Sequence, residues 1–505
     1  MSKYEPIPYK GFLGGSNQNP NMIVDIEDCW NLYPEVVSIM GIYPKNSEVT
    51  PINLRRRPGY KKLLTLPVTP CRGIYEDSGR CFVVAASTLY ELTLTGTTYS
   101  YTAWGTLTND TPGINTPVSF ASNDTQILLI SQGYGYVFTY ATNVLVPITS
   151  GAFPAGQCVQ TRDGVCIDTY GIVLQQNTNE FFYSNPLDFT QWSGLQFSSN
   201  EAPDNAVTIA ELNNYLWVFG QKEITIYQDT GGTDNVFTRY PGVQIEMGCE
   251  APQGVAQADN SLFFIARHQD GYAMAMRTKG VGGAPARIST HAIEANWQTY
   301  STCADCYITS MQFEGHVFVS YHFPTAGAVW TYDCSSNLWH RRGYWTSNFQ
   351  GGSFTEDLGR YHALWNETHI IADFSSGNIY TASYANATDN GNNIRCIRIG
   401  PYLSDGLKYT VYRSAIIDIN VGDTTIPQVS GSPEPVLLLS WTNDNGRNWS
   451  TPRALPLGFQ GQYLTRVRTN SLNRARTRAF QVVITDPIPD LAITGFVLLL
   501  EKGTQ

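Results

Sequence analysis

At 505 residues the chain is too long for one compact core, so two or more domains are expected. Hydrophobic residues make up 42% of the sequence and charged residues only 15%, and its 30 Tyr, 22 Phe and 11 Trp favour pleated strands over helices. The formal charge of −10 argues against a free-standing DNA-binding surface, and every apolar run is far shorter than the ~20 residues that span a bilayer. We therefore expect a soluble, nearly all-β protein.

The N-terminal stretch, residues 1–70, is rich in proline and carries few strand patterns. It includes a basic cluster, NLRRRPGYKK, at residues 53–62. Because proline lacks a backbone N–H and interrupts strand ladders, we predict an extended N-terminal arm that lies over another part of the protein.

A repeating unit follows between residues 71 and 390: an apolar strand, a short turn and an aromatic-rich strand. The first strands begin near positions 81, 126, 171, 215, 262, 316 and 369, at intervals of 44 to 54 residues. With four strands per unit, that period is typical of β-propeller blades, which bury both faces by stacking on their neighbours. We predict a β-propeller of about seven blades. Six or eight blades, and a β-sandwich of similar strand content, are the alternatives.

After residue 390 this period ends. Six shorter strands follow, joined by turns that contain proline and glycine, such as GSPEP and TDPIPD. Residues 391–505 are therefore predicted to form a separate β-sandwich or barrel-like domain.

This C-terminal domain contains one hairpin motif of known shape. Thr442, Asp444, Gly446 and Trp449 fit the S/T-x-D-x-G-x-x-W pattern called an Asp-box. Asp-boxes are best known from sialidases and other β-propeller glycosidases, but here the complete motif occurs once and outside the repeating units. In it Asp accepts backbone hydrogen bonds, Gly takes a positive φ and Trp packs beneath, so we interpret the motif as a structural turn.

The remaining candidate sites have ordinary structural explanations. A partial Asp-box around Asp357 ends in His where Trp or Thr is expected. His316 and His322 could share a strand face, but no carboxylate stands at metal-ligand spacing, so we expect surface or interface histidines. Cys303 and Cys306 form a C-x-x-C without a second pair at zinc-finger spacing, which indicates incidental thiols. No nucleotide-binding, hydrolase or metalloprotease motif occurs, so we expect no cofactor, no metal and no enzymatic activity.

Five arginines gather near the C-terminus despite the acidic balance of the chain. They are Arg466, Arg468, Arg474, Arg476 and Arg478. On a strand, Arg474, Arg476 and Arg478 would share one face, as would Arg466 and Arg468, because alternate side chains point to the same side. The alternatives are a solvated strand face, an ion-paired interface with an acidic neighbour, and a patch that meets DNA phosphates.

Two stretches, one near each end of the chain, carry a family resemblance. The first is an acidic tract with Cys that ends in Asn31, Leu32, Tyr33, Pro34 and Glu35. The second couples the Asp-box hairpin to Arg474-Ala475-Arg476 and then to Asp486-Pro487. Both resemble the tail-hub, or nozzle, proteins of short-tailed bacteriophages (podoviruses), also named packaged-DNA-stabilising proteins. The resemblance covers about a fifth of the chain, and the link between Glu35 and Pro58 is longer than is usual in that family.

The resemblance implies a structural virion protein. It implies a ring of six subunits that closes the channel of the portal and its adaptor protein, retains packaged DNA and conducts it during ejection. The implied partners are further copies of the chain, the portal–adaptor, a tail needle or plug, tailspikes or fibres, the host envelope, and genomic DNA that passes through the lumen without sequence-specific binding. The implied location is the virion tail, assembled in the host bacterial cytoplasm. The arginine cluster is then a candidate subunit or adaptor interface, and the alternative function is a β-propeller glycosidase or glycan-binding tail protein.

Overall fold

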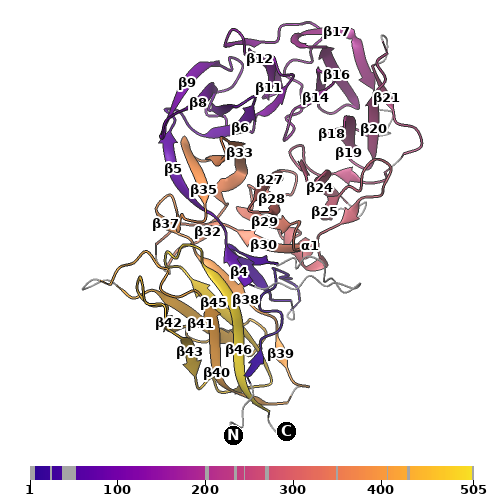
Figure 1. The fold of residues 1–505 in the computed structure, drawn as a ribbon. Coiled ribbons are helices and arrows are strands. Elements are labelled where there is room, and N and C mark those ends of the chain that lie inside the picture. Colours follow the sequence, from indigo (N-terminus) through magenta and orange to yellow (C-terminus); the bar gives the residue numbers. More distant parts are fainter. Residues whose placement is uncertain are drawn as a thin grey trace, which may run out of the picture.

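Two β domains lie end to end in the molecule, as a computed structural model shows (Figure 1). The structure describes residues 6–22, 25–36, 53–199, 204–232, 236–243, 245–267, 272–348, 351–406, 408–428 and 433–502. The larger domain is a β-propeller and the smaller one a β-sandwich. The predicted all-β class, with a propeller followed by a sandwich, is therefore confirmed.

The propeller has seven blades in the described part of the chain, each an antiparallel sheet. Blade one consists of β6 (Cys71–Asp77), β7 (Arg80–Ala85), β8 (Thr88–Thr95) and β9 (Thr98–Thr106). Blade two consists of β10 (Ser119–Ser122), β11 (Gln126–Ser131), β12 (Tyr134–Thr139) and β13 (Val144–Pro147). Blade three consists of β14 (Val165–Ile167), β15 (Tyr170–Leu174), β16 (Glu180–Asn185) and β17 (Asp188–Ser199). Blade four consists of β18 (Ala206–Leu212), β19 (Tyr215–Gly220), β20 (Ile224–Asp229) and β21 (Phe237–Arg239). Blade five consists of β22 (Gly248–Cys249), β23 (Val255–Ala258), β24 (Ser261–Arg267), β25 (Ala273–Arg277) and β26 (Ala286–Arg287). Blade six consists of β27 (Tyr307–Phe313), β28 (His316–Phe323), β29 (Ala328–Asp333) and β30 (Leu338–Arg342). Blade seven consists of β33 (Tyr361–Trp365), β34 (Thr368–Ala372), β35 (Asn378–Ser383) and β5 (Gly59–Thr65).

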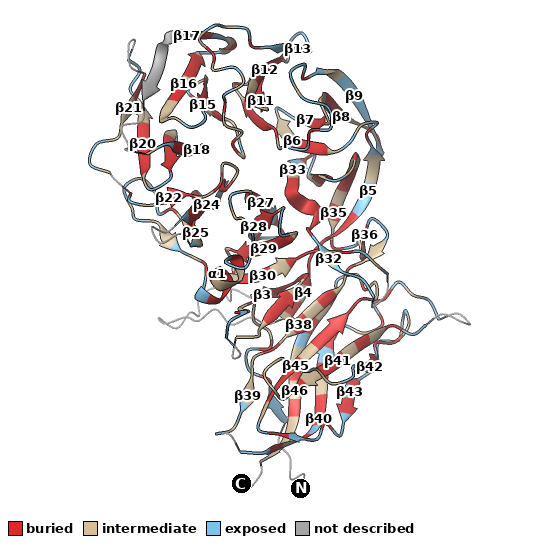
Figure 2. Ribbon diagram, turned by 180° about the vertical axis from the view of Figure 1, so that it is seen from behind, coloured by how far each residue is buried: buried red, intermediate tan, exposed pale blue. Residues whose placement is uncertain are grey.

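The repeat found in the sequence corresponds to the second and third strands of each blade. In blades one and two, β7 and β11 are buried along almost their whole length because neighbouring blades cover both faces of each sheet. Such strands read as continuous apolar runs. The outermost strand β9 is instead largely exposed, which Figure 2 shows along the rim of the propeller.

A strand from the N-terminal stretch closes the propeller ring. The strand β5 pairs antiparallel with β35 and completes the last blade. The expected boundary at residue 70 therefore divides what the structure joins, because residues 59–65 belong to the propeller. Gly59 allows this close approach, since a Cβ there would lie 2.2 Å from the backbone oxygen of Asn386. Because β5 is hydrogen bonded to β35 of the last blade and the chain continues from β5 into the first blade, this strand holds the first and last blades together.

The sandwich consists of two sheets around one apolar core. One sheet has the order β3–β4–β46–β40–β43, with β1 and β44 at its sides, and the other contains β2–β38–β45–β41–β42, with β39 beside β45. The N-terminal strands are β1 (Pro6–Pro8), β2 (Asp28–Trp30), β3 (Leu32–Glu35) and β4 (Asn53–Arg56). The others are β38 (Cys396–Ile399), β39 (Leu403–Ser404), β40 (Thr410–Ile419), β41 (Val436–Thr442), β42 (Arg453–Pro456), β43 (Val467–Asn470), β44 (Arg474–Ala475), β45 (Thr477–Ile484) and β46 (Ala492–Lys502). Leu439, Phe480 and Ile493 are among the residues of its core.

The two domains share a sheet. The strand β2 pairs in parallel with β30 of blade six and antiparallel with β38 of the sandwich. Blade six and half of the sandwich thus form one ten-stranded sheet. Because backbone hydrogen bonds cross the domain boundary, the junction is stiffer than a peptide linker would be.

Helical structure is confined to two short elements in the described ranges: α1 (His291–Trp297) and the 3₁₀ turn η1 (Leu358–Arg360). Four two-residue strands, β31 (Tyr344–Trp345), β32 (Phe354–Thr355), β36 (Thr388–Asp389) and β37 (Asn392–Asn393), surround the junction. None of the helices among the residues described here has the length and apolar character needed to cross a membrane.

Candidate functional site

The N-terminal family motif lies at the junction of the two domains. Asn31 has a left-handed backbone with φ of 55°, which Asn tolerates better than most residues. Its amide donates to the carbonyl oxygens of Gly343 and Arg395, each at 2.9 Å, and its side-chain oxygen accepts from Arg57 Nε at 2.9 Å. Gly343 follows blade six and Arg395 precedes β38 of the sandwich, so the side chain of Asn31 links the propeller to the sandwich.

The next motif residues alternate between the two domains. Leu32 packs into the sandwich core, whereas Tyr33 packs on Phe318 of the propeller and hydrogen bonds the hydroxyl of Tyr384. Pro34 is also buried, on the strand face of Leu32. Neighbouring residues of a strand point to opposite faces, so β3 is held by both domains at once.

Glu35 completes the motif in a charged cluster. Its Oε1 lies 2.9 Å from Nε2 of His316, and Oδ2 of Asp333 lies 3.0 Å from Nδ1 of the same ring. His316 and His322, which we expected at a surface or an interface, are both buried, because carboxylates compensate their burial; the partner of His322 is Glu356 at 3.1 Å. Burial alone would lower the pKa of His316, but the hydrogen bonds and charges of Asp333 and Glu35 outweigh it and raise that pKa.

We expect His316→Gln to remove a pH-dependent part of the stability. The folded pKa of His316 lies above the ~6.5 of an unfolded histidine, so the cluster stabilises fully below that value and loses this contribution as pH rises through the folded pKa. The difference in melting temperature between wild type and variant should therefore be largest at about pH 5.5 and shrink toward about pH 9. His291→Gln, at the exposed start of α1, is the matched control. A difference that grows with pH would contradict this prediction.

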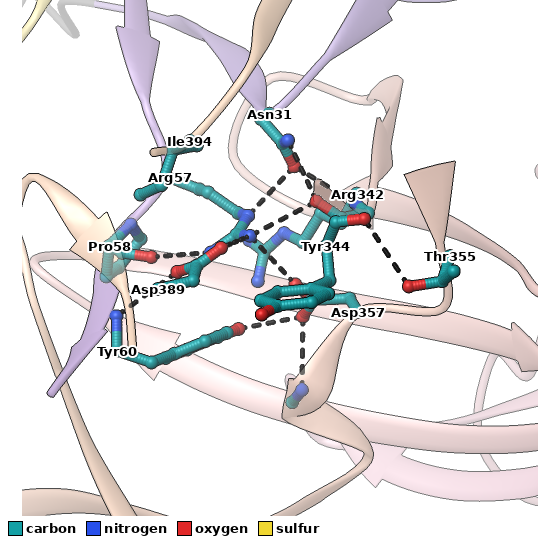
Figure 3. A network of polar contacts seen from close by, with 12 residues as sticks. Asn31, Arg57, Pro58, Tyr60, Arg342, Tyr344, Thr355, Asp357, Asp389 and Ile394 are labelled. Carbon is teal, nitrogen blue, oxygen red and sulfur yellow. Dashed lines mark hydrogen bonds and ion pairs between the residues drawn. The ribbon is translucent and has the colours of Figure 1, made fainter. Parts of the chain in front are cut away.

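A buried network around Arg57 lies in the junction (Figure 3). Its Nη1 and Nη2 lie 3.1 and 2.5 Å from the two carboxylate oxygens of Asp389, and Nη2 lies 3.1 Å from Oδ1 of Asp357. Tyr60 donates its hydroxyl to Asp357 at 2.7 Å and its backbone N–H to Asp389 at 3.2 Å. None of the three charged side chains is more than 3% exposed. Arg57 and Asp389 are 332 positions apart, so the network ties the start of the propeller to its end.

Charges in this network favour a permanently ionised Arg57. Burial opposes ionisation of Asp357, but Arg57 and Arg342 outweigh it and lower the pKa of that carboxyl. Burial dominates at Asp389 and raises its pKa, although the carboxyl binds Arg57 through both oxygens. The pKa of Arg57 is itself raised, because the two carboxylates outweigh its burial. A cation held in this way stabilises the junction and is unsuited to proton transfer.

The Asp-box hairpin joins β41 to β42. Thr442 donates its hydroxyl to Oδ1 of Asp444 at 2.8 Å and accepts from the N–H of Gly446 at 3.0 Å. The same Oδ1 accepts the N–H of Asn448 at 2.9 Å, and Gly446 has φ of 79°. The bonds from Asn448 lower the pKa of Asp444 to about 2. Trp449 is half-buried. These hydrogen bonds stay within the hairpin, which is the pattern of a rigid turn.

The five C-terminal arginines do not share one environment. Four are exposed: Arg466, Arg468, Arg474 and Arg476. Arg478 is buried, donates from Nε to Oδ1 of Asn443 at 2.8 Å and from Nη1 to the carbonyl of Leu472 at 2.6 Å, and lies 4.2 Å from the ring centroid of Tyr412. Burial lowers the pKa of Arg478 to about 10. The expected common face of Arg474, Arg476 and Arg478 is wrong, because β44 ends before Arg476 and β45 starts after it with new partner strands.

The fold does not bring the other candidate metal ligands together among the described residues. Where the structure describes the chain, no group of three His, Cys, Asp or Glu side chains is arranged to hold a metal ion. Cys303 and Cys306 are free thiols, and burial raises the pKa of Cys303 to about 12, so this thiol stays protonated at neutral pH.

Comparison of the sequence with models of protein families identifies the family of this chain. The sequence model described as "Bacteriophage P22 Gp10, beta-propeller" matches residues 38–385, and the model "Bacteriophage P22 Gp10, beta-sandwich" matches residues 398–496. The chain belongs to this family. It is therefore a phage tail protein of the nozzle, or DNA-stabilising, family and a structural component of the virion. A search of curated proteins found no match.

Solved structures resemble this family member in fold alone. PorZ of Porphyromonas gingivalis is 10% identical with a TM-score of 0.38, and the match covers 71% of this chain but only 44% of PorZ. The Pan2 WD40 domain of Neurospora crassa is 9% identical with a TM-score of 0.38, covering 65% of this chain and 95% of that domain. An exo-β-1,3-galactanase from Phanerochaete chrysosporium is 9% identical with a TM-score of 0.28, covering 88% of this chain and the whole of that chain. At these values the likeness carries no argument about function.

Residues that build the junction of this tail protein were partly missed in the sequence. The motif from Asn31 to Glu35 was identified by family resemblance, but its role in joining the domains was not. Arg57 stood out only as part of a basic cluster, and Asp357 only as a partial Asp-box. A run of arginines beside Pro58 in an acidic chain was the available signal, because a buried arginine needs fixed acceptors elsewhere in the chain.

Proposed function

We propose that this tail protein forms the nozzle of a short-tailed phage. Six copies would form a ring that closes the portal–adaptor channel, retains packaged DNA and conducts it during ejection. The observation that carries the proposal is the family match across both the propeller and the sandwich. The ring would also meet a tail needle or plug, tailspikes or fibres and, at ejection, the host envelope.

Charge and stiffness support this role. Each copy has a formal charge of −10, so six copies would carry about −60, and an acidic wall lets DNA slide past without trapping it. The ten-stranded sheet across the junction would keep propeller and sandwich in a fixed relation while DNA moves. Both properties suit a passive conduit that binds no particular sequence.

Electron microscopy of the purified chain mixed with its portal–adaptor tests the proposal. We expect six-fold rings attached to the adaptor, with the proteins copurifying in a fixed ratio. Chains that stay monomeric at all concentrations, salts and adaptor ratios would overturn the proposal. Hydrolysis of sialosides or host surface polysaccharide by the purified chain would favour the glycosidase alternative instead.

A further inference from the structure

One outward face of the sandwich gathers arginines that are distant in sequence. Strand register places Arg468 beside Ile416 of β40 and Arg474 beside Val411 of the same strand. Arg413, also on β40, is exposed and pairs with Glu501 of β46. Arg466 and Arg476 lie at the ends of the neighbouring strands. We call this set the arginine face: Arg413, Arg466, Arg468, Arg474 and Arg476.

The middle of the arginine face is apolar. Ile416 lies beside Val497 of β46, and Leu499 follows two positions later. All three side chains are half-buried, whereas the alternate residues Ile417 and Leu498 are buried in the sandwich core. An apolar centre with a charged rim is the usual anatomy of a protein–protein interface.

An exposed dipeptide, Tyr463–Leu464, lies next to this face. Leu464 is 100% exposed and Tyr463 is 64% exposed. The loop that carries them has a defined shape, because the N–H of Gly461 donates to Gly422 at 3.0 Å and that of Gln462 donates to Phe459 at 3.0 Å. A leucine that an ordered loop holds wholly in water is a candidate anchor for a partner.

Most arginines of this face lack an acidic partner within the chain. In the described ranges, no carboxylate lies within ion-pair distance of Arg466, Arg468, Arg474 or Arg476. Arg474 and Arg476 lie 5.0 and 4.7 Å from the ring centroid of Tyr409, so one exposed tyrosine orients two free guanidiniums. Orienting them in advance lowers the entropy lost when they bind carboxylates.

We propose that the arginine face and the exposed dipeptide dock on the acidic, partly apolar surface of a second copy of this chain. This inference rests on the proposed ring and names its contact. Each copy is acidic overall, so this basic face complements the remainder of a neighbouring copy and repels an identical arginine face. The contact is therefore head to tail, the type that closes into rings. Nucleic acid fits less well, because Leu464 gains nothing from a phosphate backbone.

Two variants test the contact in the full-length protein. Arg468→Glu combined with Arg474→Glu reverses two charges, and Leu464→Asp removes the apolar anchor. All three side chains are exposed, so circular dichroism should match wild type, and the melting temperature of the double variant should fall only by what the hydrogen bonds from Arg468 Nε to Ser414 at 2.9 Å and to Asn470 at 3.1 Å contribute. We expect each variant to weaken ring assembly at least tenfold in sedimentation velocity, and rising salt to weaken the wild type in the same direction. Arg447→Glu in the Asp-box hairpin and Leu364→Asp on the propeller are matched controls that should assemble normally.

A photo-crosslinker placed at Leu464 identifies the partner. Covalent dimers of the chain are the expected product, and crosslinks to the adaptor alone would overturn the inference. If wild type forms rings and both variants form them equally well, the inference fails while the proposed nozzle stands. If wild type forms no ring with or without its adaptor, the proposed function fails and the inference with it. Binding to phosphatidylglycerol vesicles that both variants lose, with assembly unchanged, would assign the face to a membrane and also overturn the inference.

Discussion

Arg57→Met is expected to lower the free energy of unfolding by about 3–5 kcal/mol. The substitution leaves the carboxylates of Asp357 and Asp389 buried without their shared cation. It also removes the Arg57 N–H that donates to the side-chain oxygen of Asn31. The variant further loses the contact between Arg57 and Asp389, which joins the start and the end of the propeller near the strand β5 that closes the ring. Urea-induced unfolding followed by tryptophan fluorescence measures the change.

Two further variants show whether the buried charges cause this loss. Arg466→Met replaces an exposed arginine and should change the free energy of unfolding by less than about 0.5 kcal/mol. Arg57→Met combined with Asp389→Asn should recover part of the loss, because one unpaired charge has been removed. A loss below about 1 kcal/mol in the single variant would show that water or rearrangement satisfies the carboxylates.

Arg398→Met is expected to release the N-terminal segment from the sandwich. The Arg398 guanidinium donates to the carbonyl oxygens of Phe12 at 2.6 Å, Gly15 at 2.7 Å and Gly11 at 2.8 Å, and it lies 3.2 Å from a carboxylate oxygen of Glu27. Arg398 is fully buried, so its loss strands several backbone acceptors, each at a cost of about 1–3 kcal/mol. Hydrogen exchange over residues 9–22 and 25–30 should accelerate before the propeller exchanges.

The control for this prediction is Arg447→Met, because Arg447 is exposed on the hairpin of the same domain. Its N-terminal segment should exchange as slowly as that of wild type. Limited proteolysis gives a second readout, since the released segment should be cut in the Arg398 variant first. Unchanged protection of residues 9–22 and 25–30 in that variant would mean that β1 and β2 hold this stretch without the arginine.

The propeller could be predicted because its signal is local and repeated. Most blades have a second strand that is covered on both faces, such as β11, and burial on both faces favours a run of mainly apolar residues. Runs of this kind recur at the length of one blade, so their period indicated the number of blades. The turn formed by Thr442, Asp444 and Gly446 was legible for the same reason, since its hydrogen bonds join residues close in sequence.

The junction could not be predicted, because its contacts join residues far apart in sequence. Proline content indicated an extended arm, yet β5 became a blade strand, since the last blade needs an outer strand and the N-terminal stretch supplies it. Alternation predicted a common face for Arg474, Arg476 and Arg478, but a break between two strands turned Arg478 into the core. Neither outcome is visible in local pattern.

The all-β class, the repeat, the C-terminal domain and the family could be read from the sequence, because strand periodicity and short motifs are properties of neighbouring residues. Which charges are buried and which are exposed depends instead on contacts between residues that are distant in sequence. Arg57 and Arg474 are the same residue type in similar basic clusters, yet one is enclosed between Asp357 and Asp389 and the other faces solvent. A buried guanidinium is tolerable only where the fold brings acceptors to it, which are carboxylates for Arg57 and amide or carbonyl oxygens for Arg478.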